Sequence, residues 1–480
     1  MARYVFKDTE SSGTDTRYDQ IFQFAGIMTD EALNELDVID VRCRRLPNVL
    51  PNPVALAVTN VDPWTLKDNK MSFFEMARFV HQKYKAWAPA TFIGHNTLGF
   101  DEEIERSMFW LNLLDPYVTN TKGSSRADTL IMLRAAHALR PGLLNVRQHA
   151  ETGSPIFKLE ILAPDNGFES HNAHDALGDI RANIHVARIV KDKAPDIWAS
   201  MMRNASPADA EDIVSQPLVL MMTHFGKAEF FPAVRIAMNP GNKRQALMLD
   251  LSRDFRPWLA MSPEEIADGI FSKESPFQTL KTNAMPTVFS PTDPIAVEKW
   301  KEVASLTPDL QERRFEVMAH PTFVENCVAA LKLKNGAFEP STNVEEQIYG
   351  SFASWGNKDR MKAFHAHADW AERLSTAGGF KDDKEDDRFH KIATRIFWSE
   401  APHLLSPEVV RAIDERVAAE RIFGPATQAS GKPSRWCTMA QAREDLAKIA
   451  DHPLYERIKS WYDGLEAAVK ADPSAVRTFG

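Results

Sequence analysis

The sequence has few cysteines, no long apolar run and no excess of basic residues. Its three cysteines, Cys43, Cys327 and Cys437, are far apart and match no zinc-binding spacing, which fits a reducing cytoplasm. Because nowhere do about 18 apolar residues follow one another, we expect no transmembrane helix and no membrane partner. The opening residues lack the order of a secretory signal, so we expect no export.

The net charge is −9, which argues against a protein that coats nucleic acid by bulk electrostatics, because phosphate binding rests on clustered Lys and Arg. The charge still allows a nuclease, since carboxylates that hold divalent cations add negative charge and a basic groove can coexist with an acidic remainder. A chain of 480 residues predicts two or three packed units.

The order of apolar patterns predicts three domains. Alternating strand and helix patterns predict an α/β domain over 1–195, and a polar stretch at 193–212 indicates a linker. Strand-like runs predict a small β-rich domain over 196–342, and helical periodicity predicts a helical domain over 343–480. In the first domain we expect strands at 4–7, 21–28, 38–42 and 91–94, and helices at 72–87, 102–114, 127–139 and from 173.

An acidic pair follows the first expected strand. Asp8 and Glu10 are two residues apart, so in an extended chain both side chains point to the same face and can reach one cation. Hard cations such as Mg²⁺ prefer carboxylate oxygens. An Asp-x-Glu triplet alone is weak evidence for a metal site, because many such triplets occur by chance and at solvent-exposed strand ends.

Another carboxylate, Asp101, comes shortly after the apolar strand expected at 91–94. At a strand-to-helix junction it can face the same site as Asp8, and it also benefits from the positive end of the helix dipole. Taken alone, Asp101 is more simply explained as a helix N-cap.

The stretch HNAHDALGD at 171–179 places His174 and Asp179 at the start of an expected helix. Asp175 and Asp179 are four residues apart and share a helix face. A carboxylate on this helix can complete a metal site. A histidine near the N-terminus of this helix can accept a proton from water, because the ordinary pKa of histidine is about 6.5. A lone histidine here would more often be a cap or a packed surface residue.

Together, the Asp-x-Glu pair, the later Asp and the His-x4-Asp motif resemble, in this order, the DEDDh exonuclease superfamily. Longer strings resemble bacterial exonuclease I: QFAGIMTD at 23–30, FDEEIERSMFW at 100–110, ALRP at 138–141 and SHNAHDALGDI at 170–180. Strings at 217–226, 246–254 and 343–352 resemble its later domains, so the resemblance covers nearly the whole chain.

The resemblance implies a ribonuclease H-like exonuclease domain, an SH3-like β domain and an α-helical domain. It implies 3′→5′ hydrolysis of single-stranded DNA to 5′-mononucleotides, in DNA repair and recombination, by a cytoplasmic enzyme that we expect to be a monomer. Asp8, Glu10, Asp101 and Asp179 would hold two Mg²⁺ ions, which Mn²⁺ can replace, and His174 would be the general base. The implied protein partner is the C-terminal tail of single-stranded DNA-binding protein.

The resemblance also implies DNA contacts at Glu10, Arg106, Tyr117, Arg134 and Lys158. Cations suit phosphates and an aromatic ring can stack on a base, although each of these side chains has an ordinary surface or interior role as its alternative. Thr9 and Thr121 stand where aromatic residues are expected, which puts the strength of stacking at the 3′ end in doubt.

Two other functions compete with this interpretation. A DEDDh exoribonuclease would carry the same catalytic cluster, because recognition of a 2′-hydroxyl needs contacts that the cluster does not supply. A catalytically inert DNA-binding scaffold is a weaker alternative, since all five catalytic positions are intact. Assays on labelled single-stranded DNA and RNA, with and without Mg²⁺, separate the three.

Overall fold

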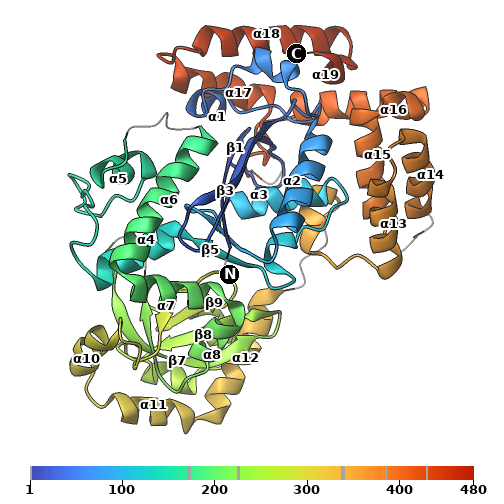
Figure 1. Ribbon diagram of the computed structural model, residues 1–480. Helices are drawn as coiled ribbons and strands as arrows, with labels where there is room; N and C mark the ends of the chain where they lie inside the picture. Colours follow the sequence, from blue (N-terminus) through green and yellow to red (C-terminus); the bar gives the residue numbers. More distant parts are fainter. Residues whose placement is uncertain are drawn as a thin grey trace.

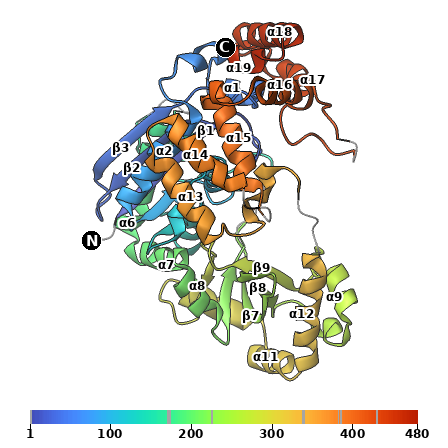
Figure 2. The same ribbon diagram turned by 90° about the vertical axis from the view of Figure 1, so that its right-hand side faces the viewer.

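The computed structural model describes residues 3–169, 175–223, 227–336, 341–381, 383, 386–428 and 431–479. Figure 1 shows a central sheet flanked by helices, a second sheet below it, and helical layers at the top and right. After a turn of 90° the second sheet still lies below the first (Figure 2). The mixed α/β class and the helical C-terminal region predicted from the sequence are confirmed.

The first sheet consists of β1 (Tyr4–Ser11), β2 (Ile21–Thr29), β3 (Glu35–Arg42), β4 (Thr91–Gly94) and β5 (Ser125–Asp128). Its order is β3-β2-β1-β4-β5, in which β1 pairs antiparallel with β2 and parallel with β4, and β4 pairs parallel with β5. Because parallel strands end at the same edge of a sheet, the carboxyl ends of β1, β4 and β5 meet there.

Three strands differ from the sequence prediction, and one of them, β3, begins at Glu35 instead of 38. β1 extends to Ser11, well beyond the expected strand at 4–7, so the acidic pair lies inside the strand. The last two residues of β5, Ala127 and Asp128, were expected to begin a helix at 127–139, but that helix begins only at Thr129. The strand SRAD is too short and too polar to show a strand periodicity of its own.

Helices cover both faces of the first sheet (Figure 1). Side chains alternate along β1, so Val5 packs in the core with α2 and α3, whereas Phe6 packs in the core with α4 and α6. Asp8 and Glu10 have the parity of Phe6 and therefore face α6. The helices of this region are α1 (Pro53–Val58), α2 (Phe73–Trp87), α3 (Asp101–Trp110), α4 (Thr129–Leu139), α5 (Leu159–Asp165) and α6 (Ala176–Lys193).

The expectation of a linker at 193–212 is wrong, because this stretch forms α7 (Pro195–Ala205) and α8 (Pro207–Val214). Both helices begin with proline, and the Ser206 side chain caps α8. Proline at the first helical position lacks only an N–H that would have no helical partner, so here it starts helices instead of breaking them.

The second sheet is antiparallel, in the order β10-β6-β7-β8-β9. It lies in the region where the resemblance implies an SH3-like domain, and the domain boundaries at 195 and 342 stay predictions. Its strands are β6 (Val219–Met222), β7 (Phe230–Asn239), β8 (Asn242–Asp250), β9 (Phe277–Lys281) and β10 (Val288–Phe289), accompanied by α9 (Pro263–Gly269), α10 (Val297–Leu306), α11 (Leu310–Met318) and α12 (Pro321–Asn335).

The C-terminal helices pack against the first α/β region. Leu56 of α1 shares a hydrophobic core with Trp461 and Val476, so the two regions are joined by buried apolar surface. Among the described residues, no helix has the length and apolar character to cross a bilayer. The helices are α13 (Trp355–Ala366), α14 (Trp370–Lys381), α15 (Arg388–Glu400), α16 (Pro407–Arg416), α17 (Met439–Leu446), α18 (Tyr455–Ala471) and α19 (Ala475–Thr478).

Candidate active site

Three acidic side chains meet between β1 and α6. Asp8 and Glu10 project from β1, and Asp179 projects from the first turn of α6. Each offers a carboxylate oxygen, and these three oxygens lie within 4.8 Å of one another. A Mg²⁺ ion with bonds of about 2.1 Å places opposite ligand oxygens ~4.2 Å apart. One cation could therefore be held by all three carboxylates after their oxygens move slightly closer together.

The electrostatics of this cluster favour a cation. Burial raises the pKa of Asp8 well above its usual range, and the charges of Asp101, Glu10 and Asp179 raise it further. Burial also raises the pKa of Glu10 to about 8, again with help from Asp179 and Asp101. Carboxyl groups that are costly to ionise together become favourable ligands when a divalent cation supplies the missing positive charge.

Asp101 stands beside this group at the start of α3. It is the first helical residue and Phe100 holds the N-cap position, so the N-cap explanation for Asp101 is wrong. Burial raises the pKa of Asp101, while the Thr9 hydroxyl donates a hydrogen bond of 2.6 Å to its Oδ1. One oxygen of Asp101 is therefore fixed by Thr9, the residue that replaces the expected aromatic.

The proposed base, His174, lies outside the described residues. The residue after it, Asp175, occupies the N-cap position of α6. Its Oδ1 accepts hydrogen bonds from Gln23 Nε2 at 3.1 Å and Arg42 Nη2 at 3.0 Å. Asp175 is therefore tied to the neighbouring strands β2 and β3, whereas Asp179 joins the carboxylate cluster.

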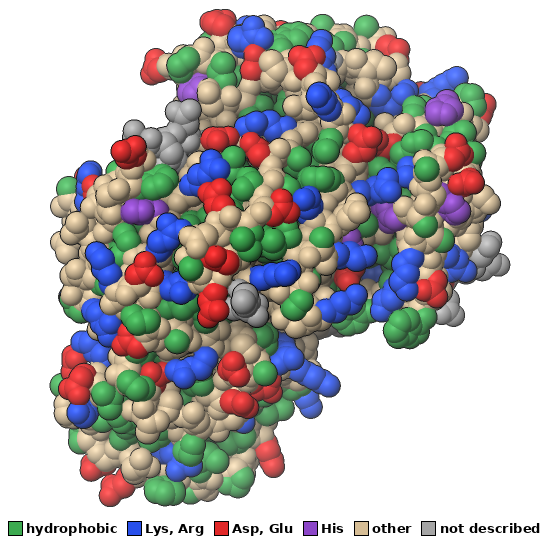
Figure 3. All heavy atoms as spheres, viewed as in Figure 1, with side chains coloured by type: hydrophobic (Ala, Val, Ile, Leu, Met, Phe, Trp, Pro, Cys, Tyr) green, Lys and Arg blue, Asp and Glu red, His purple; other side chains and the backbone are tan. Residues whose placement is uncertain are grey.

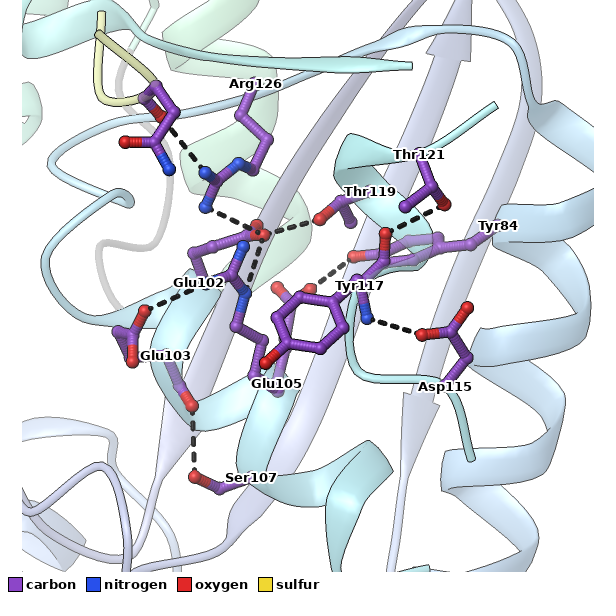
Figure 4. Close-up of polar contacts among 12 residues, drawn as sticks. Tyr84, Glu102, Glu103, Glu105, Ser107, Asp115, Tyr117, Thr119, Thr121 and Arg126 are labelled. Atoms are coloured by element: carbon purple, nitrogen blue, oxygen red, sulfur yellow. Dashed lines mark hydrogen bonds and ion pairs between the residues drawn. The ribbon is translucent and has the colours of Figure 1, made fainter. Parts of the chain in front are cut away.

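A buried ionic network lies on the opposite face of β1. Lys7 is 1% exposed and its Nζ lies 3.1 Å from Glu102 and 2.6 Å from Glu105. Arg126 also contacts Glu102, and the Tyr84 hydroxyl donates to Glu105 at 2.7 Å (Figure 4). Burial opposes ionisation of Glu102, but Lys7 and Arg126 outweigh it and hold its pKa at about 2.

Sequence reasoning missed this network, and it also missed Asp128 at the end of β5. The Asp128 carboxylate caps α4 through the Leu130 N–H. It also accepts hydrogen bonds from the backbone N–H groups of Asn96 and Leu98, in the loop that leads to Asp101. Asp128 directly precedes an apolar helical run, so its capping role was readable from the sequence.

Two of the predicted DNA contacts, Arg106 and Tyr117, lie next to each other. The Arg106 guanidinium lies 5.4 Å from the centre of the Tyr117 ring. Arg106 is only 7% exposed and pairs with Glu102 and Glu103, so it is held inside the protein. Tyr117 is half-buried at the edge of the Glu102 cluster (Figure 4).

Of the other three, Glu10 belongs to the carboxylate cluster, and Arg134 and Lys158 lie near α4 and α5. Arg134 is half-buried, with its guanidinium 5.9 Å from the centre of the Phe157 ring. Burial lowers its pKa. Lys158 holds the N-cap position of α5 and is exposed, with its Nζ 3.6 Å from Glu160. The DNA-binding roles of all five residues stay predictions.

Comparison with known proteins adds an independent observation. Residues 5–187 match the sequence model of the exonuclease family. Exodeoxyribonuclease I of Escherichia coli (strain K12) is 28% identical over 386 residues, which cover 75% of this chain and 79% of that protein. Over about three quarters of its length, the chain is similar to exodeoxyribonuclease I. The resemblance and the prediction of a nuclease hydrolase are thereby confirmed.

Solved structures of exodeoxyribonuclease I share this fold. E. coli Exonuclease I in complex with a dA16 oligonucleotide has a TM-score of 0.80 at 21% identity, covering 97% of this chain and 100% of that one. The zinc ion bound form of the E. coli ExoI-ssDNA complex has a TM-score of 0.79 at 22% identity, covering 97% and 99%. The ribonuclease H-like fold predicted for the nuclease domain is confirmed.

Proposed function

We propose that this chain hydrolyses single-stranded DNA from the 3′ end and releases 5′-mononucleotides. The observation that carries the proposal is the grouping of Asp8, Glu10 and Asp179 oxygens within 4.8 Å inside an exonuclease domain. The E. coli relative crystallised with single-stranded oligonucleotides supports the choice of substrate.

The four carboxylates Asp8, Glu10, Asp101 and Asp179 would hold two Mg²⁺ ions, for which Mn²⁺ can substitute. Bound cations would supply positive charge to the attacking and leaving oxygens of the phosphodiester. The buried, mutually repelling carboxylates support this assignment, because their pKa values are raised by burial and by one another. The hydrogen bond from Thr9 orients Asp101 and leaves its second oxygen for a ligand role.

His174 would accept the proton of the attacking water. Its position in the sequence supports this role, because it directly precedes Asp175 at the N-cap of α6, the helix that carries Asp179. An imidazole with its ordinary pKa near 6.5 is mostly neutral at pH 7 and can take a proton.

We also propose the cellular setting that the resemblance implies. A cytoplasmic, monomeric enzyme of DNA repair would meet single strands coated by single-stranded DNA-binding protein, and would bind its acidic, apolar C-terminal tail. Such a tail needs a basic rim beside an apolar pocket, which we place near the junction of the nuclease and SH3-like regions. Titration of the host's tail peptide at low salt tests this interaction, and a peptide that does not bind removes it.

The decisive experiment uses 5′-labelled oligonucleotides with and without Mg²⁺. We expect single-stranded DNA to shorten from its 3′ end, releasing 5′-mononucleotides, only in the presence of the metal. A 3′-blocked strand and a blunt duplex serve as matched substrates and should resist. Equal degradation of either one contradicts the proposed polarity and strand preference.

The same assay with an RNA strand of identical sequence tests the exoribonuclease alternative. Faster cleavage of RNA than of DNA would indicate an exoribonuclease instead. DNA binding without cleavage of either strand at any Mg²⁺ or Mn²⁺ concentration would instead indicate an inert scaffold.

A further inference from the structure

Three aromatic side chains stand exposed in the segment that leads from the second sheet to the C-terminal helices. Tyr349 ends the short 3-10 helix η4 (Val344–Tyr349), Phe352 follows in an irregular stretch, and Trp355 begins α13. They are 50%, 77% and 79% exposed. Single exposed apolar residues are common and need no explanation, but a row of three large rings at three-residue spacing is unusual.

The row continues into the nuclease region. The Phe352 ring lies edge-on to the Tyr117 ring, with centroids 5.7 Å apart. Tyr117 in turn lies against Arg106 of α3, the helix whose first residue is Asp101. Aromatic and cationic side chains are therefore in contact from Arg106, at the edge of the Glu102 network, through Tyr117 to Phe352, and Trp355 follows three residues later in the chain.

Cations lie over the rings of this row. The Lys358 ammonium lies 4.8 Å from the centre of the Trp355 ring, and the Arg17 guanidinium lies 5.0 Å from the centre of the Tyr349 ring. Lys358 has no carboxylate within ion-pair distance among the described residues. One turn later, Lys362 pairs with Asp359 at 3.0 Å. Lys358 is thus placed to contact an anion next to the exposed indole.

The surface around this row suits a polyanion. In Figure 1, α13 begins at the lower edge of the right-hand lobe, facing the second sheet. Figure 3 shows Lys and Arg side chains along the recess where these two lobes meet. Exposed rings interleaved with cations are the pattern by which proteins bind single-stranded nucleic acid, because every base has a face on which a ring can stack.

We propose that Trp355 and Lys358 form a station for single-stranded DNA, in which the indole stacks on a base and the ammonium contacts the adjacent phosphate. The station would hold the strand on the 5′ side of the nucleotides at the carboxylate cluster. It rests on the proposed function, since it extends the path of the same substrate.

Oligonucleotides of increasing length test the station. We expect wild-type affinity for oligo-dT, measured without divalent metal, to rise once the strand is long enough to reach Trp355. Trp355→Ala should lose this rise, a loss of roughly 5- to 150-fold for long strands, because stacking contributes about 1 to 3 kcal/mol per base. Cleavage of strands too short to reach α13 should keep its wild-type kcat, and only KM for long strands should increase.

Matched variants separate stacking from a structural effect. Trp355→Phe keeps a stacking ring and should restore most of the affinity. Phe315→Ala removes another exposed ring with a guanidinium beside it, that of Arg314, but from α11 and away from the row, so it should bind as the wild type does. Lys358→Gln should make binding of long strands less sensitive to salt.

The outcomes distinguish this inference from the proposed function. Wild-type affinity of Trp355→Ala for every strand length overturns the station, while cleavage by the unaltered protein still stands. If Trp355→Ala binds DNA normally but a self-association of the wild type disappears in sedimentation, the row is a protein contact and the station is again overturned. A wild-type protein that neither binds nor cleaves single-stranded DNA removes the proposed function itself.

Discussion

The two faces of β1 treat buried carboxylates in opposite ways. On the α6 face, burial and mutual repulsion raise the pKa of Asp8 and that of Glu10. On the α3 face, Lys7 and other cations outweigh burial at Glu102 and hold its pKa at about 2, although burial still raises the pKa of its neighbour Glu105 to about 7. Since neighbouring residues of one strand point to opposite faces, a single residue step separates Asp8, whose pKa burial and nearby carboxylates raise, from Lys7, which pairs with Glu102.

This difference between the two faces separates residues proposed for catalysis from residues that stabilise the fold. Carboxylates without balancing protein cations cost folding free energy and gain it back only when a divalent cation binds. Carboxylates paired with buried cations stabilise the fold without any ligand, but their charge is already neutralised and cannot bind a catalytic cation. Substitutions on the two faces should therefore separate turnover from stability.

The largest expected effect is on turnover, from Asp179→Ala. Removing this ligand should lower cleavage of single-stranded DNA by at least ~10³-fold, since several kcal/mol of charge stabilisation depend on the bound cations. Folding should survive, and the metal-free variant should melt at the same temperature or higher. Asp175→Ala is the matched control, because Asp175 contacts Gln23 and Arg42 and should keep most of its turnover.

Next comes His174→Ala, which leaves the carboxylates intact. Loss of a general base typically lowers turnover by about 10² to 10⁴-fold. Binding of Mg²⁺ and of DNA should persist, as isothermal titration would show. Near wild-type turnover of His174→Ala, together with its loss in Asp175→Ala, would mean that base and ligand are misassigned on this helix.

On the other face, Lys7→Met should mainly affect stability. It leaves Glu102 and Glu105 without their central cation, and breaking a buried pair costs about 3 to 5 kcal/mol. Chemical denaturation measures this loss. Lys83→Met, which breaks a half-exposed pair with Asp37 at 3.0 Å, is the control and should cost about 0 to 1 kcal/mol. Equal losses for the two variants would contradict the importance of the buried network.

The smallest effect is the pH dependence of the metal-free protein. The pKa of Glu10 is about 8 in the folded protein, above the 4.5 expected in the unfolded chain. Protonated Glu10 therefore makes its full contribution to the free energy of unfolding below pH 4.5, and this contribution is lost as the pH rises through 8. Glu10→Gln should remove this loss and stabilise the metal-free protein at pH 8 by on the order of 2 kcal/mol. The gain should shrink at pH 5 and disappear in saturating Mg²⁺.

The sequence predicted the positions of the acidic residues better than their surroundings. Spacing in β1 and the resemblance were enough to place Asp8, Glu10 and Asp179 together. The partners of Lys7 come from α3, and nothing in a single sequence shows which helix packs on which face of a strand. Likewise, the two proline-led helices at 195–214 were mistaken for a linker, because proline starts helices as readily as it ends them.

The central position of β1 also has a consequence for synthesis of the chain. β1 pairs in parallel with β4, which begins at Thr91, and the carboxylate cluster is completed only by Asp179 on α6. Contacts between residues so distant in sequence close large loops and form late in folding. A nascent chain therefore emerges from the ribosome with its acidic strand exposed, and the carboxylate cluster is complete only after α6 has emerged and docked on the sheet, so the proposed metal site forms only at that step.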